Sequence, residues 1–209
     1  MSKITRPVKV SANIEDKTSF LMFADPEFNG EYWLRGGVYW PAIPHGQSRC
    51  NDGYAVLVGQ NVKTGRCFVF EERSFITVDH VLGDDQIIAF EGLSSFFNMA
   101  WSSYFADTFF WQQPEDVHHR FLLQVIRSPM IQPQPHFVEV HLSKPEDSIT
   151  SIWNLMKTGL LAYPEGGGVH TDLQLYQVQI GSPAPAPIRA LAACLFGMEL
   201  YPHRVRRIA

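Results

Sequence analysis

The hydrophobic pattern of the chain predicts strands first and helices later. Two β-rich stretches, GYAVLVGQ at 53–60 and RCFVFEER at 66–73, are separated by NVKTG. Gly65 in this connection can adopt the positive φ that a hairpin turn requires. Residues 136–143, HFVEVHLS, alternate apolar and polar side chains as a half-buried strand does. These segments predict a hairpin and one further strand.

Two short apolar runs end directly at an acidic residue. The run at 20–24 stops at Asp25, and the run at 87–90 stops at Glu91. Both have the length and the boundaries of short buried strands. Between them, residues 29–52 are rich in glycine, proline and aromatic side chains. That composition indicates a long connection with room for a hairpin.

Helical signals follow in the second half of the chain. Aromatic and small residues at 93–110 favour a buried helix, although a strand stays open there. Ser143 and Glu146 fit a capping box that opens a helix with Pro145 in its first turn and Gly159 as its stop. Pro187 begins a last helix that extends to about residue 200. We therefore predict an α/β fold, a mixed sheet with helices packed on it.

Composition sets the scale of the molecule. With 209 residues, of which 45% are hydrophobic, the chain can bury one full core. We predict an N-terminal arm or linker remnant at 1–17, a single domain at 18–200 and a basic tail at 201–209. No apolar run is long enough for a membrane helix, and the N-terminus has no signal-peptide pattern, so we expect a cytoplasmic protein without membrane contact.

Charge and cysteines narrow the function classes. A net charge of −4 gives no global attraction for nucleic acid, so DNA binding needs a local basic surface or a bound cation. The three cysteines Cys50, Cys67 and Cys194 form no CxxC pair. This argues against a zinc knuckle and a disulfide framework, and it favours reduced, structural thiols.

Acids at the ends of strands have two interpretations. Asp25 and Glu91 can cap turns, which is common. Alternatively, carboxylates at the ends of adjacent strands, joined by one from a nearby helix, can hold two Mg²⁺ or Mn²⁺ ions about 4 Å apart. Such ions activate water and stabilise the leaving oxygen of a phosphodiester. This is the chemistry of a ribonuclease H-like nuclease.

A resemblance to a known family supports the second interpretation. The segments FADPEFNG, NDGYAVLVGQNVKTGRCFVFEE, IIAFEGLSSFFN, SITSIWNLMKTGLLAYPEGG, TDLQLYQ and IRALAACLFGM follow one another in an order that resembles the nuclease domain of the tailed-phage terminase large subunit. The resemblance spans roughly residues 18–200. It implies a ribonuclease H-like fold and a DNA endonuclease that cuts DNA during genome packaging.

The resemblance also assigns roles to particular residues. It implies catalytic acids at Asp25, Glu91 and Asp52, with Asp25 and Glu91 binding Mg²⁺ or Mn²⁺. The family's third metal-binding Asp falls at Arg189, so a cation replaces a ligand. Asp172, or alternatively His170, is the candidate substitute, because both side chains ligate Mn²⁺.

The remaining expectations concern partners and an alternative function. Arg189 and the tail arginines Arg204, Arg206 and Arg207 are candidate contacts for double-stranded DNA. No Walker motif is present, so any packaging ATPase would be a separate partner, alongside other phage packaging proteins. The alternative is a non-catalytic ribonuclease H-like domain that binds DNA or protein, in which Arg189 neutralises the old acidic site.

Overall fold

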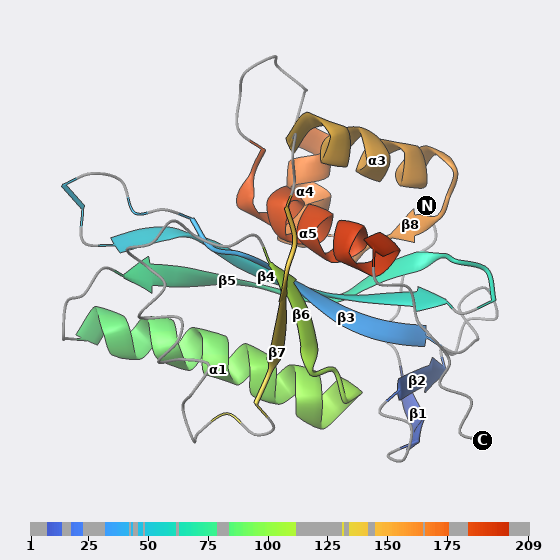
Figure 1. Cartoon of the computed structure of the whole chain (residues 1–209), viewed down its shortest axis with the longest axis horizontal. Helices are drawn as coiled ribbons and strands as arrows, with labels where there is room; N and C mark the ends of the chain where they lie inside the picture. The colour runs from blue at the N-terminus through green and yellow to red at the C-terminus, as the bar shows by residue number, and fades with distance from the viewer. Residues whose placement is uncertain are drawn as a thin grey trace.

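The computed structural model describes residues 8–13, 18–22, 32–41, 43, 46–47, 49–61, 63–78, 84–111, 131, 134–141, 145–164, 166–175 and 184–200. The strands are β1 (Val8–Asn13), β2 (Thr18–Met22), β3 (Tyr32–Tyr39), β4 (Arg49–Asn61), β5 (Cys67–Val78), β6 (Thr108–Trp111), β7 (His136–Glu139) and β8 (Leu161–Ala162). The helices are α1 (Asp84–Tyr104), α3 (Pro145–Lys157), α4 (Gly168–Leu175) and α5 (Ala186–Leu200). Figure 1 shows their arrangement.

A mixed six-stranded sheet forms the centre of the molecule, with the strand order β7-β6-β3-β4-β5-β8. Strands β3, β4 and β5 are antiparallel neighbours, whereas β6 runs parallel to β3 and β7 runs parallel to β6. At the opposite edge, β8 runs parallel to β5. This is the predicted α/β class.

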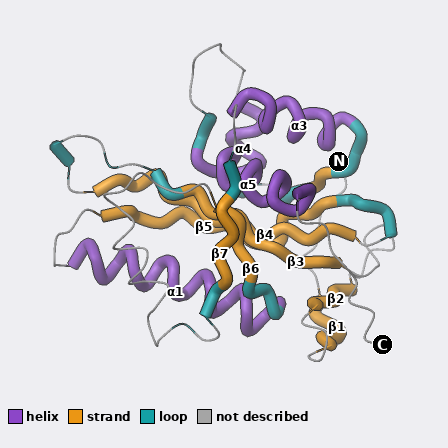
Figure 2. Tube along the Cα trace, viewed as in Figure 1, coloured by secondary structure: helices purple, strands orange, loops and turns teal. Residues whose placement is uncertain are grey.

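Helices cover both faces of this sheet, as Figures 1 and 2 show. On one face α1 buries Leu93, Phe96, Phe97 and Ala100 in an aromatic-rich core. On the other face α3, α4 and α5 share a second core, to which α5 contributes residues from Ile188 to Met198. The sheet is therefore buried on both faces in its middle, which accounts for the long apolar stretches of β3, β4 and β5.

The predicted hairpin and the predicted second-half helices are confirmed. Gly65 has a φ of 70° in the β4–β5 turn. Helix α3 ends at Lys157, and Gly159, whose φ is 69°, lies in the turn that terminates it. There the Leu160 amide donates to the Leu155 carbonyl and the Gly159 amide donates to the Met156 carbonyl, the two bonds of a Schellman cap. Strand β7 and helix α5 also lie where the sequence predicts them.

The strand predicted at 87–90 is wrong, because those residues lie inside α1. A quartet of apolar residues fits a strand and a buried helix equally well. The residues that follow decide in favour of the helix. They repeat at helical spacing and pack on the sheet, and they are Leu93, Phe96, Phe97 and Ala100. The helix predicted for 93–110 is confirmed as far as Tyr104, and β6 follows it.

The central strand β3 lies within the stretch that the sequence predicted as a connection. Its side chains are buried on both faces, so they show no alternation of apolar and polar residues. Gly36 and Gly37 also resemble turn residues in sequence. In the sheet they let neighbours approach: Gly36 faces the Phe109 ring, and Gly37 faces the backbone of Ala190 in α5.

The N-terminal strands form a sheet of their own. Strand β2 pairs with β1 in a two-stranded antiparallel sheet, so it does not join the six-stranded sheet. It confirms a strand at the apolar run before Asp25, although Asp25 itself lies outside the described residues. Strand β1 falls within the segment predicted as an arm. The domain boundaries at 17 and 200 stay a prediction.

Candidate functional site

The carboxyl ends of two adjacent parallel strands meet beside the start of helix α5. Val38 pairs in register with Trp111, so β3 and β6 end at the same edge of the sheet. Strand β3 ends at Tyr39, and β6 ends at Trp111. Neither residue, nor Gln112 that follows in the sequence, is acidic. The two-metal site that the sequence analysis considered needs carboxylates at the ends of adjacent strands.

A pocket of about 470 Å³ opens at this edge. The pocket brings together the end of β3, the β4 segment around Asp52, helix α4 and the start of α5. Its lining residues are Tyr39, Asp52, Gly53, Tyr54, Asp172, Ala184, Pro185, Ala186, Pro187 and Arg189. We call it the β3–α5 pocket.

Arg189 is held against the end of β3. Its Nη1 donates a 2.9 Å hydrogen bond to Tyr39 Oη, and its guanidinium carbon lies 4.9 Å from the centre of the Tyr39 ring. Its Nε is buried and has no hydrogen-bond partner among the described residues. Stacking on an aromatic ring together with a hydrogen bond fixes a guanidinium in one place. The side chain therefore puts a permanent positive charge beside the end of β3.

Acidic groups lie on the other side of the pocket. Glu72 Oε2 accepts a 2.8 Å hydrogen bond from Tyr54 Oη and a 2.9 Å bond from the Val169 amide in the first turn of α4. The Glu72 carboxylate thus satisfies an amide that the start of a helix leaves without an intrahelical partner. Asp172, one turn further along α4, is half-buried. The arrangement ties α4 to β5 and turns Asp172 towards the pocket.

The Glu72 carboxylate affects the pKa values of two neighbouring side chains, Asp172 and Tyr54. Burial, and then the negative charge of Glu72, raise the pKa of Asp172 above its usual value. Burial and the same carboxylate raise the pKa of the Tyr54 hydroxyl, which therefore stays protonated and donates to Glu72. Like charges that crowd one another in a partly buried site are an electrostatic feature of binding sites.

The structure brings three of the predicted site residues to one pocket and separates a fourth from them. Asp52, Asp172 and Arg189 all line the β3–α5 pocket. Glu91 is exposed on α1, which covers the opposite face of the sheet (Figure 1). The described structure therefore does not place Glu91 with Asp172. Asp25 and the tail arginines Arg204, Arg206 and Arg207 lie outside the described residues.

His170, the alternative substitute ligand, has a local structural role. Its Nδ1 accepts a 3.0 Å hydrogen bond from the Gly166 amide, and its ring lies 5.6 Å from that of Tyr163. Within the described part of the chain, no three side chains of His, Cys, Asp and Glu gather closely enough to hold a metal ion. With Arg189 and Tyr39 at the end of β3, the described residues do not fit a two-metal centre there.

Sequence reasoning missed Tyr39 and Glu72. Tyr39 lies in the stretch whose composition indicates a connection, although Trp40 and Pro41 directly after it are typical of a strand end. Glu72 lies in the predicted hairpin strand RCFVFEER, and that pattern gives it no further role. Its signal in the sequence is a pair of acids, Glu71 and Glu72, directly after the apolar run at 67–70.

Comparison with solved structures shows a close match of architecture. The nuclease domain of the human cytomegalovirus terminase, soaked with Mn, superimposes with a TM-score of 0.51 at 13% identity, covering 97% of this chain and 95% of that domain. The chain has a terminase-nuclease fold. This confirms the predicted ribonuclease H-like architecture and the resemblance on which it was based.

A second neighbour is the large terminase nuclease of thermophilic phage G20c with bound magnesium. It has a TM-score of 0.47 and 13% identity, and the match covers 83% of this chain and 85% of that one. No protein-family model matches the chain, and no curated protein is similar to it in sequence. The likeness is therefore one of fold. None of the helices in the described part of the chain has the length and apolar character needed to cross a membrane.

Proposed function

We propose that this chain is a non-catalytic domain of the terminase-nuclease type, which acts as a binding module in DNA packaging. The observation that carries the proposal is the pairing of Arg189 with Tyr39, 2.9 Å apart, where the end of β3 meets the start of α5. A guanidinium at this place repels divalent cations. Unlike a metal ion, it supplies no bound water for attack on phosphorus.

The fold supports the packaging context of the proposal. The neighbours of this chain are nuclease domains of terminases, and two of those structures were obtained with manganese or magnesium. We infer that this chain keeps their architecture for contacts with double-stranded DNA or with packaging proteins, such as a separate ATPase. In this proposal the fixed charge of Arg189 takes the place of a metal ion near Asp52 and Asp172.

Titration with Mn²⁺ tests this proposal at the pocket itself. We expect no heat of Mn²⁺ binding in calorimetry of the wild-type chain. Arg189→Asp removes the cation and adds a carboxylate beside Asp52 and Asp172, so we expect this variant to gain one weak Mn²⁺ site. Arg66→Asp, a charge reversal on an arginine outside the pocket, serves as the control and should gain no site. Stoichiometric Mn²⁺ binding by the wild-type chain contradicts the proposal.

One observation favours a second candidate, a divalent-metal-dependent DNA endonuclease. Asp52 and Asp172 line the same pocket, and the pKa of Asp172 is raised by burial and by Glu72. Crowded carboxylates of this kind gain most from a cation. In this alternative Asp52, Asp172 and the proposed ligand Asp25 act together, and Arg189 contacts DNA phosphate. It predicts DNA cleavage in Mn²⁺ that Asp172→Asn weakens at least as strongly as Asp25→Ala does.

A further inference from the structure

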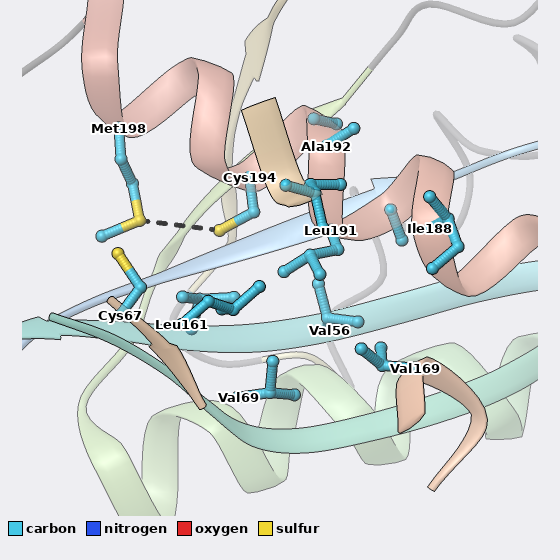
Figure 3. Close-up of a cluster of buried hydrophobic side chains, with 14 of the residues drawn as sticks. Val56, Cys67, Val69, Leu161, Val169, Ile188, Leu191, Ala192, Cys194 and Met198 are labelled. Carbon is cyan, nitrogen blue, oxygen red and sulfur yellow. Dashed lines mark hydrogen bonds between the residues drawn. The ribbon is translucent and has the colours of Figure 1, made fainter. Parts of the chain in front are cut away.

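Three sulfur atoms converge in the core between the sheet and α5, away from the β3–α5 pocket. Cys194 and Met198 lie four residues apart on one face of α5, and the Cys194 Sγ is 3.8 Å from the Met198 Sδ. Cys67, the first residue of β5, directs its sulfur into the same space, as Figure 3 shows. The three side chains are almost fully buried, with exposed fractions of 4% for Cys67, 0% for Cys194 and 3% for Met198.

We propose that Cys67, Cys194 and Met198 form a binding site for a soft monovalent cation of the Cu(I) type. Thiolate and thioether sulfurs are the ligands that select Cu(I) over harder cations. A bond between a first-row metal and a thiolate sulfur is about 2.3 Å long, so two sulfurs of a trigonal site lie about 4 Å apart. The 3.8 Å between the Cys194 Sγ and the Met198 Sδ suits such a site without movement of α5.

The surroundings of the sulfurs favour a soft cation over a hard one. The site lies in an apolar core that includes Val69, Leu161 and Leu191. Around the site, the Cys194 thiol lies 3.4 Å from the Arg35 carbonyl oxygen and the Cys67 thiol lies 3.6 Å from the Gly65 carbonyl oxygen. The side chains of this core are apolar, and such surroundings suit a soft cation better than the oxygen-preferring Mg²⁺ and Mn²⁺.

A route to the site exists along one wall. Cys67 and Met198 both line a pocket of about 600 Å³ between the β4–β5 hairpin, α3 and α5, with Gln60 and Glu199 on the same lining. Burial raises the pKa of the Cys67 thiol to about 11, so the empty site holds neutral thiols. Each thiol that coordinates the cation releases its proton to solvent, and no oxidant or reductant takes part when Cu(I) itself is supplied.

Anaerobic titration of the full chain with Cu(I), in competition with the chelator bicinchoninate, tests the proposal. We expect one Cu(I) per chain to resist the chelator. Loss of a residue that only supports a metal ligand typically lowers the affinity for the metal about 10- to 100-fold. Loss of a ligand itself should cost at least as much, so we expect Cys67→Ser and Met198→Leu each to weaken Cu(I) binding by at least about tenfold. Cys50→Ser is the matched control, because Cys50 faces Asp52 and not this cluster. It should leave binding unchanged.

Two further points keep the test decisive. Circular dichroism establishes that each variant is folded, and Met198→Leu, which conserves volume, guards against a result caused by unfolding. X-ray absorption of the loaded chain should show sulfur ligands alone. Loss of all copper to the chelator by the wild-type chain overturns the proposal. So does equal retention by wild type, Cys67→Ser and Met198→Leu, which would show that these sulfurs serve only as core side chains.

Discussion

At the scale of single residues, Arg189 defines the chemistry of the β3–α5 pocket. Its charge is permanent, and its position is fixed by the Tyr39 ring and hydroxyl. A divalent metal ion at the same place would neutralise carboxylates and also lower the pKa of a bound water. The guanidinium can do only the first of these. We propose that this charge takes the place of a metal ion beside Asp52 and Asp172 in the pocket.

The raised pKa of Asp172 leads to a prediction about stability and pH. Because the pKa of folded Asp172 lies above its ordinary value of 3.8, the folded chain keeps this proton to higher pH than the unfolded chain does. Stability therefore falls as the pH rises from 3.8 through the folded pKa, and the loss persists at neutral pH. Asp172→Asn removes this loss. We expect the variant to have a higher free energy of unfolding than wild type at pH 7.

Urea denaturation across the acidic range provides the measurement. The gain in free energy of unfolding from Asp172→Asn should shrink as the pH falls. It should vanish well below pH 3.8, where Asp172 is protonated in the folded and in the unfolded chain alike. A variant that is less stable than wild type at pH 7 would show that the Asp172 carboxylate has a stabilising partner. A difference that is constant over the whole range would show that the charge of Asp172 is irrelevant.

At this scale the sequence predicts the pocket in part. Asp52, Asp172 and Arg189 were candidates from the resemblance, and all three line the pocket. Tyr39 is missed because its strand is missed, although Trp40 and Pro41 directly after it are typical of a strand end. The prediction for Glu91 depends on a strand at 87–90, and those residues are helical. Local pattern alone does not reveal which face of a sheet an element covers.

At the scale of elements, the close packing of α5 on β3 positions Arg189. Gly37 has no side chain, so the backbone of α5 at Ala190 and the Cβ of Cys194 lie directly over it. Helix α5 is apolar around most of its circumference because it lies between the sheet and α3. Its first turn therefore reaches the end of β3, where Arg189 meets Tyr39.

Gly37→Ala should disrupt this packing. An added methyl group would collide with the Ala190 carbonyl, which is backbone and can yield only if α5 shifts. Overpacking of this kind costs about 1–3 kcal/mol, and we expect a loss near the upper end in urea denaturation. Gly92→Ala is the control, because a Cβ there meets only Phe75 at 3.7 Å within α1. Gly92→Ala should stabilise the chain by about 0.5–1 kcal/mol.

A Gly37→Ala variant as stable as wild type contradicts this description of the α5 contact.

Elements were predictable where a local signal dominates. The β4–β5 hairpin follows from Gly65 between two β-rich stretches, and α3 follows from its apolar spacing and the stop at Gly159. Strand β3 was missed because burial on both faces removes the alternation on which strand prediction depends. Its two glycines serve tertiary packing, which a sequence pattern interprets as a turn.

At the scale of the whole molecule, the fold resembles that of a nuclease, whereas the pocket holds an arginine. The fold is similar to that of the human cytomegalovirus terminase nuclease domain, and the match extends over nearly the whole chain. The pocket at the edge of the sheet, however, holds the fixed charge of Arg189 together with Asp52 and Asp172. A fold can persist while its site changes, because core packing and site chemistry depend on different residues.

The most direct test of this account is cleavage of supercoiled plasmid by the purified full chain. Reactions in Mn²⁺, in Mg²⁺ and in EDTA should be run beside identically purified Asp25→Ala and Asp172→Ala variants, with folding checked by circular dichroism. We predict that the wild-type chain nicks no more plasmid in either metal than it does in EDTA. Metal-dependent nicking by the wild-type chain that is lost in Asp25→Ala or Asp172→Ala would contradict the account and establish a working nuclease.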